Sequence, residues 1–435
     1  MAAAEMTHAP LSEERLNTLQ RQTFEYLRRE SNADNGLVAD KTQVGSPASI
    51  AAVGMALAAL PIAVKRGFID RAEARTRTLT TLRFFWNSPH GPQPNATGYK
   101  GFYYHFLDMQ SGRRVWNCEL STIDSTFLLA GMLTARVYFD ADSSDEQEIR
   151  TLADSLYRRV DWDWARNGAA TVAHGWTPEN GFLPYRWEGY DEALLLYVLG
   201  LGSPTHALPL ESYPAWSSTY AWKTIYDYEL VYAGPLFIHQ FSHLWIDFRG
   251  IRDAFMRGKG IDYFENSRRA TYIHQRYSIE NPLEFAHYNE HCWGITASDG
   301  PGWEMRRIRG REQAFYGYYA RGAPYGPDDG TISPWAAVAS LPFCQEIVLP
   351  VLRRFEEIDL CVDHPYGFRA SFNPTFPTAS GRAHGWVSPF HFGINQGPIV
   401  LMIENYRSEF LWHLMRRCPY IVAGLRRAGF NGGWL

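Results

Sequence analysis

The sequence predicts an all-α fold, a toroid in which two kinds of helix alternate along the chain. Amphipathic helical segments recur, segments that are apolar on all sides lie between them, and sustained period-two alternation is scarce. Helices with no face suited to water must be enclosed, and the amphipathic helices can enclose them. If the inner helices run parallel, their N-termini gather on one rim.

The amphipathic segments carry an apolar stripe among Arg- and Glu-rich positions, as helices with one solvated face do. They cover residues 11–30, 69–86, 145–164, 265–277 and 346–358. The enclosed segments cover residues 49–64, 123–139, 193–201, 235–246, 332–341 and 398–403. The Pro- and Gly-rich stretches between them are interpreted as long rim loops, so residues 1–435 are predicted to form a single domain.

Charge and cysteine usage exclude several classes of protein. The chain has 42 Lys and Arg against 46 Asp and Glu without a basic block, so neither nucleic acid nor a membrane surface is an expected partner. Its five cysteines show no CxxC spacing, so neither a disulfide framework nor a zinc ribbon is expected. No metal or cofactor is predicted, and the pattern makes no prediction of oligomeric state.

The N-terminus lacks the basic and apolar regions of a signal peptide. Residues 1–10 are expected to form a disordered tail of a cytoplasmic protein. Aromatic residues make up 15% of the chain, and Trp and Tyr suit the apolar face of a sugar ring as well as a protein core. The aromatic candidates for sugar stacking are Trp116, Trp187, Tyr190, Trp293 and Trp335.

Polar clusters precede the enclosed helices, at residues 40–42, 119–124, 191–192, 328–330 and 395–397. Helix capping explains some of them, but it does not require paired acids beside Trp and Tyr. We therefore interpret this rim as a candidate active site, with Asp329 and Gln396 among its substrate contacts. The Asp-Gly pairs that begin at Asp299 and Asp329 are also ordinary turn signals.

Glu192 is the strongest candidate for catalysis. It lies in Trp187-Glu188-Gly189-Tyr190-Asp191-Glu192, directly before an apolar helix, where partial desolvation would raise the pKa of a carboxyl toward that of a general acid. The alternative is capping by Asp191 with Glu192 as a first-turn partner of the helix dipole.

Asp124 falls on an otherwise apolar helix, with Glu119 at the start of that helix. An unpaired acid there is costly, although nearby Ser and Thr hydroxyls could satisfy either residue. Glycoside hydrolysis requires two such carboxyl groups, one as acid and one as base or nucleophile.

His239, His243 and Asp247 would share one face of a helix. This spacing is a weak signal for a metal triad, and hydrogen bonding to sugar hydroxyls or to the core is the favoured interpretation.

Taken together, these segments resemble the bacterial glucoamylase-like family. The strings that carry the resemblance are ELSTIDSTFLLAGML (119–133), GFLPYRWEGYDEALLLYVLGLGSPTH (181–206), GPLFIHQFSHLWIDFRGIRD (234–253), DYFENSRRATY (262–272), CWGITASDGPG (292–302), APYGPDDGTISPWAAVASLPF (323–343) and GINQGPIVLMIENYR (393–407). The resemblance implies an (α/α)6 barrel, and among the family's best-understood members are inverting endo-β-1,2-glucanases.

The resemblance further implies that Glu192 is essential and that Glu119, Asp124 and Asp299 lie along the same cleft. The expected function is hydrolysis of a β-linked oligo- or polysaccharide, β-1,2-glucan above all, with Glu192 as general acid. Asp124 or Glu119 would position or activate the water. The alternatives are a transglycosylase that forms new or cyclic linkages, a non-catalytic glucan-binding protein, and a metal-dependent lyase that uses His239 and His243.

Overall fold

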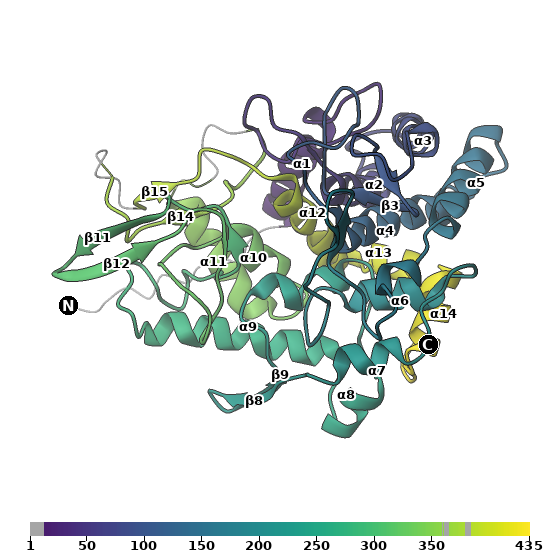
Figure 1. Cartoon of the computed structure of the whole chain (residues 1–435). Helices are drawn as coiled ribbons and strands as arrows, with labels where there is room; N and C mark the ends of the chain where they lie inside the picture. Colours follow the sequence, from purple (N-terminus) through teal and green to yellow (C-terminus); the bar gives the residue numbers. More distant parts are fainter. Residues whose placement is uncertain (1–12, 359, 361–364, 379–383) are drawn as a thin grey trace.

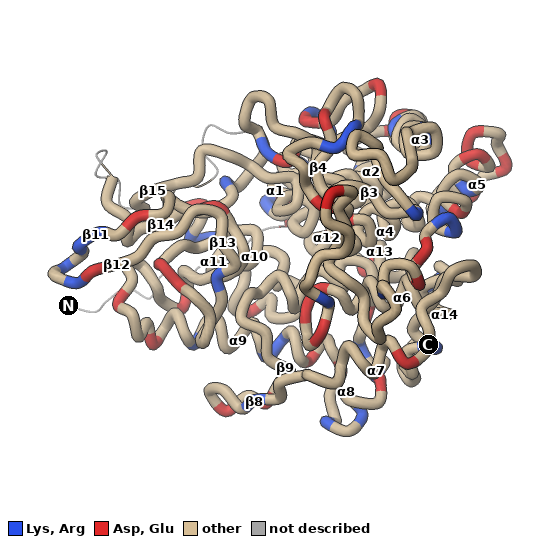
Figure 2. Tube along the Cα trace, viewed as in Figure 1, with Lys and Arg blue, Asp and Glu red and all other residues tan. Residues whose placement is uncertain are grey.

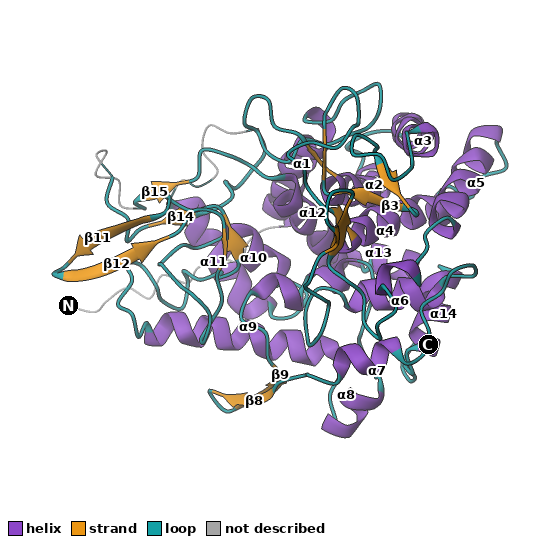
Figure 3. Ribbon diagram, in the orientation of Figure 1, coloured by secondary structure: helices purple, strands orange, loops and turns teal. Residues whose placement is uncertain are grey.

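Helices dominate the computed structural model of the chain, and the strands among them are short (Figure 3). The structure describes residues 13–358, 360, 365–378 and 384–435, so Cys361 and the expected N-terminal tail lie outside the described residues. Lys and Arg are interspersed with Asp and Glu, for example along α5 (Ser144–Arg158) and at the tip of the hairpin formed by β11 (Glu304–Ile308) and β12 (Arg311–Phe315) (Figure 2). Of the helices that the structure describes, none has the length and apolar character that crossing a membrane requires.

The inner elements of the fold are five helices buried along most of their length. They are α2 (Ile50–Lys65), α4 (Thr122–Tyr138), α6 (Leu194–Gly202), α10 (Pro334–Ala339) and α12 (Gly393–Ser408). Helix α4 packs against α2 and α6, and α12 packs against α2 and α10.

Two 3-10 turns, η2 (Leu236–His239) and η3 (Phe241–Leu244), join α6 to α10. Ser242 Oγ accepts a hydrogen bond from the Leu195 N–H of α6 at 3.1 Å, and Gln240 Nε2 donates to the Ala336 carbonyl of α10 at 2.7 Å. These contacts complete a ring of inner elements.

The outer helices bury one face and expose the other. They are α1 (Glu13–Arg29), α3 (Arg71–Asn87), α5, α9 (Tyr263–Glu280) and α11 (Gln345–Glu357). In Figure 1, α1, α3 and α5 lie outside α2, α4 and α12, and α9 runs along the lower side. Shorter helices complete the chain: α7 (Ser212–Ser217), α8 (Ala254–Lys259), α13 (Phe410–Met415), α14 (Pro419–Arg427) and the 3-10 turn η1 (Trp164–Arg166).

Helices α2 and α4 approach closely because glycines meet at their crossing. A Cβ on Gly54 would overlap the Phe127 carbonyl, and a Cβ on Gly131 would overlap the carbonyl of Gly54. Buried apolar side chains from Leu16 to Phe430 form one continuous core cluster.

Short antiparallel strands form much of the loop structure. A sheet runs in the order β2 (Gly98–Tyr99), β3 (Phe102–Tyr104), β5 (Leu120–Ser121), β6 (Gly175–Thr177), β7 (Gly181–Phe182). Paired strands are β1 (Ala48–Ser49) with β4 (Phe106–Leu107), β8 (Trp222–Ile225) with β9 (Tyr228–Val231), β10 (Ala297–Ser298) with β13 (Tyr319–Ala320), β11 (Glu304–Ile308) with β12 (Arg311–Phe315), and β14 (Phe372–Asn373) with β15 (Trp386–Val387).

The structure confirms a mainly helical fold and corrects the sequence prediction in three places. The fold is not purely all-α, because strands of two to five residues are too short to give sustained alternation. The segment 235–246 forms η2 and η3 instead of one helix, since the polar side chains of Gln240 and Ser242 bond to the neighbouring helices. The helix expected at 398–403 is α12, which begins at Gly393 and continues through Pro398.

Candidate active site

A cavity of about 560 Å³ opens at the end of the ring where the inner elements begin, a size typical of ligand sites. Its wall takes at least one residue from the start of each inner element: Ser49, Asp124, Glu192, Phe241, Trp335 and Ile394. This confirms the expectation that these N-termini gather on one rim.

Asp124 reaches the cavity from the first turn of α4 and is 6% exposed. Ser121, the N-cap of this helix, accepts a hydrogen bond from the Asp124 N–H at 3.1 Å and donates its hydroxyl proton to Asp124 Oδ2 at 2.5 Å. A Ser N-cap therefore both starts the helix and fixes its one early carboxylate.

His105 links Asp124 to Glu119. It lies between β3 and β4, and the pairing of β3 with β5 brings it next to Glu119, whose carbonyl accepts from the His105 N–H at 3.0 Å. Its Nδ1 lies 2.8 Å from Glu119 Oε1 and its Nε2 lies 3.6 Å from Asp124 Oδ2.

Electrostatics favour an imidazolium between two carboxylates. Burial alone would lower the pKa of His105, but the charges of Asp124 and Glu119 outweigh it and raise the pKa to about 9. Burial alone would raise the pKa of Glu119, but the hydrogen bond and charge of His105 hold it below its usual value. Near neutral pH His105 is therefore protonated and Glu119 ionised.

Glu192 lies in the turn before α6 and lines the cavity. Burial, with the negative charges of Asp191 and Asp124 adding to it, raises the pKa of Glu192 to about 8. Its neighbour Asp191 has a different environment, since Asp191 Oδ1 accepts from the Ala193 N–H at 2.9 Å and from Trp216 Nε1 at 3.0 Å. Asp191 is thus held by the turn before α6 and by Trp216, while Glu192 lines the cavity with a raised pKa.

Three predicted aromatic residues line the cavity: Trp116, Trp187 and Trp335. The Trp187 ring stacks on His174 with centroids 3.8 Å apart, and its Nε1 donates to Thr122 Oγ1 at 2.9 Å. Trp116 is 66% exposed and so offers an open face. Asp299 also lines the cavity, as the resemblance implied, and its Oδ2 accepts from Ser388 Oγ at 2.7 Å.

Chemically, the cavity combines a protonated carboxylic acid with an ionised carboxylate held by an imidazolium. Two carboxyl groups whose environments give them opposite protonation states are the requirement for general acid and general base chemistry. The surrounding aromatic surface suits a substrate with flat apolar faces.

A family model described as "Putative glucoamylase" matches residues 184–419. The chain belongs to this glucoamylase-like family. The resemblance that the sequence motifs indicated is confirmed.

Relatives of this glucoamylase-like chain include an exo beta-1,2-glucooligosaccharide sophorohydrolase (non-reducing end) from Parabacteroides distasonis, 28% identical over 457 residues. The alignment covers 97% of this chain but 58% of that protein, so the chain spans little more than half the length of this curated relative.

Two solved structures match over their full length. A putative glucoamylase from Bacteroides uniformis is 30% identical with a TM-score of 0.86, covering 98% of this chain and 100% of that chain. An endo-beta-1,2-glucanase from Chitinophaga pinensis, in a complex with sophorotriose and glucose, is 27% identical with a TM-score of 0.84. It covers 98% of this chain and 100% of that chain.

The structure does not place His239 and His243 in the cavity wall. His239 Nε2 lies 3.1 Å from the Ala233 carbonyl, and His243 Nε2 lies 3.0 Å from Ser267 Oγ. Burial lowers the pKa of His239 to about 4 and that of His243 to about 3. Asp247 forms ion pairs with Arg249 and Arg416. Of the two favoured interpretations, hydrogen bonding within the core therefore holds for both histidines and the sugar contacts do not.

Tyr190 and Trp293 are also core residues, so their predicted stacking on sugar is wrong. Tyr190 packs between Tyr220, Tyr263 and His239, with ring centroids 5.1–5.8 Å away. Trp293 is fully buried. The direction of an aromatic ring cannot be predicted from composition, because a ring suits the core as well as a sugar.

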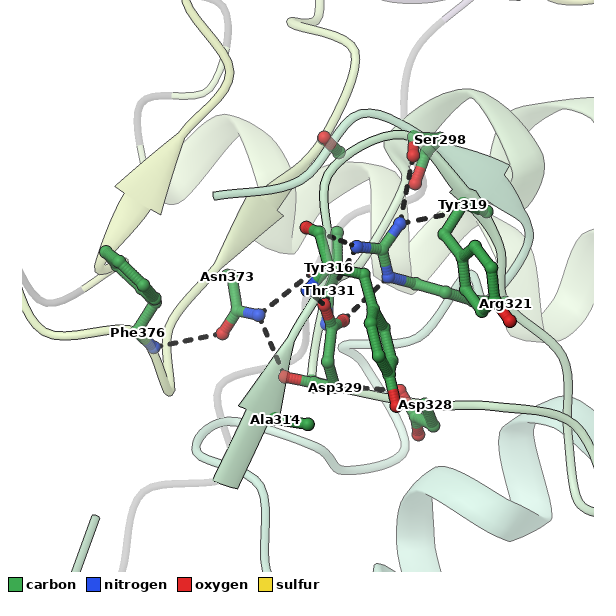
Figure 4. A network of polar contacts seen from close by, with 12 residues as sticks. Ser298, Ala314, Tyr316, Tyr319, Arg321, Asp328, Asp329, Thr331, Asn373 and Phe376 are labelled. Carbon is green, nitrogen blue, oxygen red and sulfur yellow. Dashed lines mark hydrogen bonds and ion pairs between the residues drawn. The ribbon is translucent and has the colours of Figure 1, made fainter. Parts of the chain in front are cut away.

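Asp329 and Gln396 are likewise absent from the cavity wall that the described residues form. Asp329 is fully buried in an ion pair with Arg321 (Figure 4). Gln396 is 1% exposed, and the preceding residue, Asn395, lines the cavity in its place. Successive residues of a helix point in directions about 100° apart, so a shift of one position moves a side chain to another face.

Asp40 and Lys41 of the predicted rim cluster 40–42 line the cavity, whereas several other cavity residues were not predicted, among them His105, His174 and Tyr318. Burial raises the pKa of Asp40 to about 6. A signal for His105 was present, because it is the one residue with a basic side chain in the otherwise aromatic and aliphatic run Phe102–Leu107. Such a residue at the end of a buried strand needs a partner, and its partners here are Glu119 and Asp124.

His105, Glu119 and Asp124 also form a group whose potential ligand atoms lie within 4.8 Å of one another, close enough to hold a metal ion. A metal requires the neutral imidazole, so a metal ion would have to displace the proton that the raised pKa of His105 holds near neutral pH.

Proposed function

We propose that this glucoamylase-like chain is a glycoside hydrolase that cleaves β-1,2-linked glucan, with Glu192 as its general acid. The names of two relatives, the sophorohydrolase and the Chitinophaga enzyme, specify hydrolysis of β-1,2-linked glucose chains. The observation that carries the proposal is the raised pKa of Glu192 in a cavity that also holds the Asp124–His105–Glu119 cluster.

The reaction that we propose is a single displacement with inversion. Glu192 donates its proton to the glycosidic oxygen as the bond to the anomeric carbon breaks, and a water oxygen attacks that carbon from the opposite face. Asp124 or Glu119 accepts the proton that the water loses. His105 is proposed as a positioning residue, because it contacts both carboxylates and its charge lowers the pKa of Glu119.

For substrate binding we propose stacking of glucosyl rings on Trp116, Trp187 and Trp335, with hydrogen bonds from polar side chains such as Asp299 and Asn395. This arrangement needs neither metal nor cofactor. Tyr318 adds a phenol to the same wall.

For the architecture we propose an (α/α)6 barrel that comprises one domain. Counting η2 and η3 together gives six inner segments, and helices that pack outside them supply the outer layer. Support for one domain comes from the core cluster, which is continuous between residues near the two ends of the described chain.

The test is product formation from β-1,2-, β-1,3-, β-1,4- and α-linked glucans, resolved by chain length and by the anomer of the first product. We expect α-anomeric products from β-1,2-glucan alone. Glu192→Gln should lower kcat by roughly 10²–10⁴-fold, the usual contribution of general acid catalysis.

Glu188→Gln is the matched control, since Glu188 belongs to the same motif but is exposed and bonds to Thr171 outside the cavity wall. It should retain wild-type kcat. Absence of product from every glucan with the folded protein, or full activity in Glu192→Gln, would overturn the proposal. Cyclic or newly linked products would instead identify a transglycosylase.

A further inference from the structure

An aromatic cluster that the cavity does not include lies on the surface next to it. The rings of Trp303, Tyr316 and Tyr319 pack with centroids 4.9–5.5 Å apart. Trp303 is 67% exposed and Tyr319 is 38% exposed. We call these three residues the aromatic platform. Large rings held together with an open face are uncommon on a surface that binds nothing.

The aromatic platform adjoins residues of the cavity wall along the chain at two points. Tyr318, between Tyr316 and Tyr319 in the chain, lines the cavity, and its ring lies 5.9 Å from that of the cavity residue Phe392. At the other end, Asp299 of the cavity wall is followed by the short segment that leads to Trp303. The pairing of β10 with β13 holds these two segments side by side.

Arg321 fixes the segment that carries Tyr316 and Tyr319, two of the three rings (Figure 4). Its guanidinium is fully buried and donates to the carbonyls of Tyr316 and Gly317, each at 3.1 Å. Asp329 pairs with Arg321, and its Oδ2 also accepts from the Tyr316 N–H at 2.9 Å. We call the buried ion pair of Arg321 and Asp329 the clamp. Tyr316 and Tyr319 are therefore held in place before any ligand arrives, and Trp303 packs on both, which lowers the entropic cost of binding.

We propose that the aromatic platform is an outer glucan-binding subsite, which stacks on a glucosyl unit of a chain whose cleaved linkage lies in the cavity. This inference rests on the proposed function and adds that the substrate extends beyond the cavity. A pyranose fits the open Trp303 face, because its C–H face is apolar while its hydroxyl edge stays in water. Its connection to the cavity wall identifies the occupant as the same chain, rather than a separate ligand.

The test compares kcat/KM on long β-1,2-glucan and on the β-1,2-linked trisaccharide. Trp303→Ala should lower kcat/KM on the long chain by roughly tenfold, since one ring face loses its partner, and should leave the trisaccharide unchanged. Trp303→Phe keeps a smaller ring, so its kcat/KM on the long chain should lie between the values of the wild type and of Trp303→Ala. Tyr325→Ala is the matched control, because Tyr325 is 64% exposed and its ring contacts Tyr232 instead of the platform.

The outcomes separate the subsite from the proposed function. If the wild type cleaves both substrates and Trp303→Ala affects them equally or affects neither, the outer subsite is wrong and the proposed function stands. If the folded wild type cleaves no β-1,2-glucan of any length, the proposed function fails and the subsite fails with it.

Discussion

The cavity and the Arg321–Asp329 clamp both enclose carboxylates, yet they give them opposite properties. In the clamp, Asp329 Oδ1 and Oδ2 accept from Arg321 at 2.7 and 2.8 Å, and both side chains are fully buried. In the cavity, the charges that act on Glu192 are those of two other carboxylates, Asp191 and Asp124, and both raise its pKa.

The difference shows what separates a structural acid from a reactive one. A buried carboxylate with a matched cation stays ionised and holds loops together. A carboxyl enclosed without a cation keeps its proton and can donate it. The cluster of His105 with Glu119 and Asp124 lies between these cases, since one cation serves two carboxylates.

The largest expected effect comes from breaking the clamp. Arg321→Met leaves the charge of Asp329 buried without a partner, so we expect the free energy of unfolding to fall by about 3–5 kcal/mol. Urea denaturation of the purified variant measures it. Adding Asp329→Asn should recover part of the loss, because the double variant no longer buries an unpaired charge.

Arg83→Met is the control for removal of an arginine as such. Arg83 pairs with Glu148 on the surface, where the two side chains are 51% and 39% exposed, so its loss should cost about 1 kcal/mol or less. An Arg321→Met variant no less stable than Arg83→Met would contradict the structural role of the clamp.

The helical ring could be predicted from the sequence because its signal is local. The all-round apolar character of residues 49–64 and 123–139 predicted α2 and α4 to within about one residue at each end. The turns η2 and η3 could not be predicted, because the partners of Gln240 and Ser242 lie on helices distant in sequence.

Part of the candidate site could also be predicted, because the signal for that part is local as well. Glu192, Asp124 and Glu119 precede or begin apolar helices, and the structure places all three in the cavity wall. Asp329 has a similar local pattern, but its partner Arg321 stands eight residues earlier and is brought to it by the fold. As a sequence pattern, the Asp-Asp-Gly motif at 328–330 therefore resembles Asp191-Glu192 before α6, and the sequence alone does not show which of the two provides an acid to the cavity.

A smaller effect should follow from removing the cation of the cavity. His105→Gln takes away the charge that favours ionised Glu119, so we expect kcat/KM on β-1,2-glucan to fall by roughly 10²-fold. The pKa of Glu119 rises without the imidazolium, so with Glu119 as the base the acidic limb of the pH–rate profile should move to higher pH. His413→Gln is the control, because the His413 side chain is 56% exposed. It should change neither kcat/KM nor the position of the acidic limb.

The profile of kcat/KM against pH distinguishes this role from a loss of structure. Unfolding lowers activity at every pH, whereas loss of the imidazolium lowers it most on the acidic side. An His105→Gln variant with reduced activity and an unmoved acidic limb would contradict the proposed positioning role.

The smallest effect concerns Asp191 and Glu192, adjacent residues with different contacts. In the wild type, activity should fall as pH rises through about 8, where Glu192 loses the proton that it must donate. Burial raises the pKa of Asp191 to about 7, so above that pH its charge is largely present while Glu192 titrates. Asp191→Asn keeps an oxygen to accept from the Ala193 N–H and Trp216 Nε1 but removes this charge.

We therefore expect the alkaline limb of Asp191→Asn to move to lower pH, with kcat near pH 6 close to that of the wild type. The sign follows because a neighbouring negative charge disfavours ionisation of Glu192, so its removal makes the proton easier to lose. The limb is measured from kcat/KM at constant ionic strength, since screening weakens the interaction. An unmoved limb would mean that burial alone sets the pKa of Glu192, and the charge of Asp191 would then have no part in the difference between the two acids.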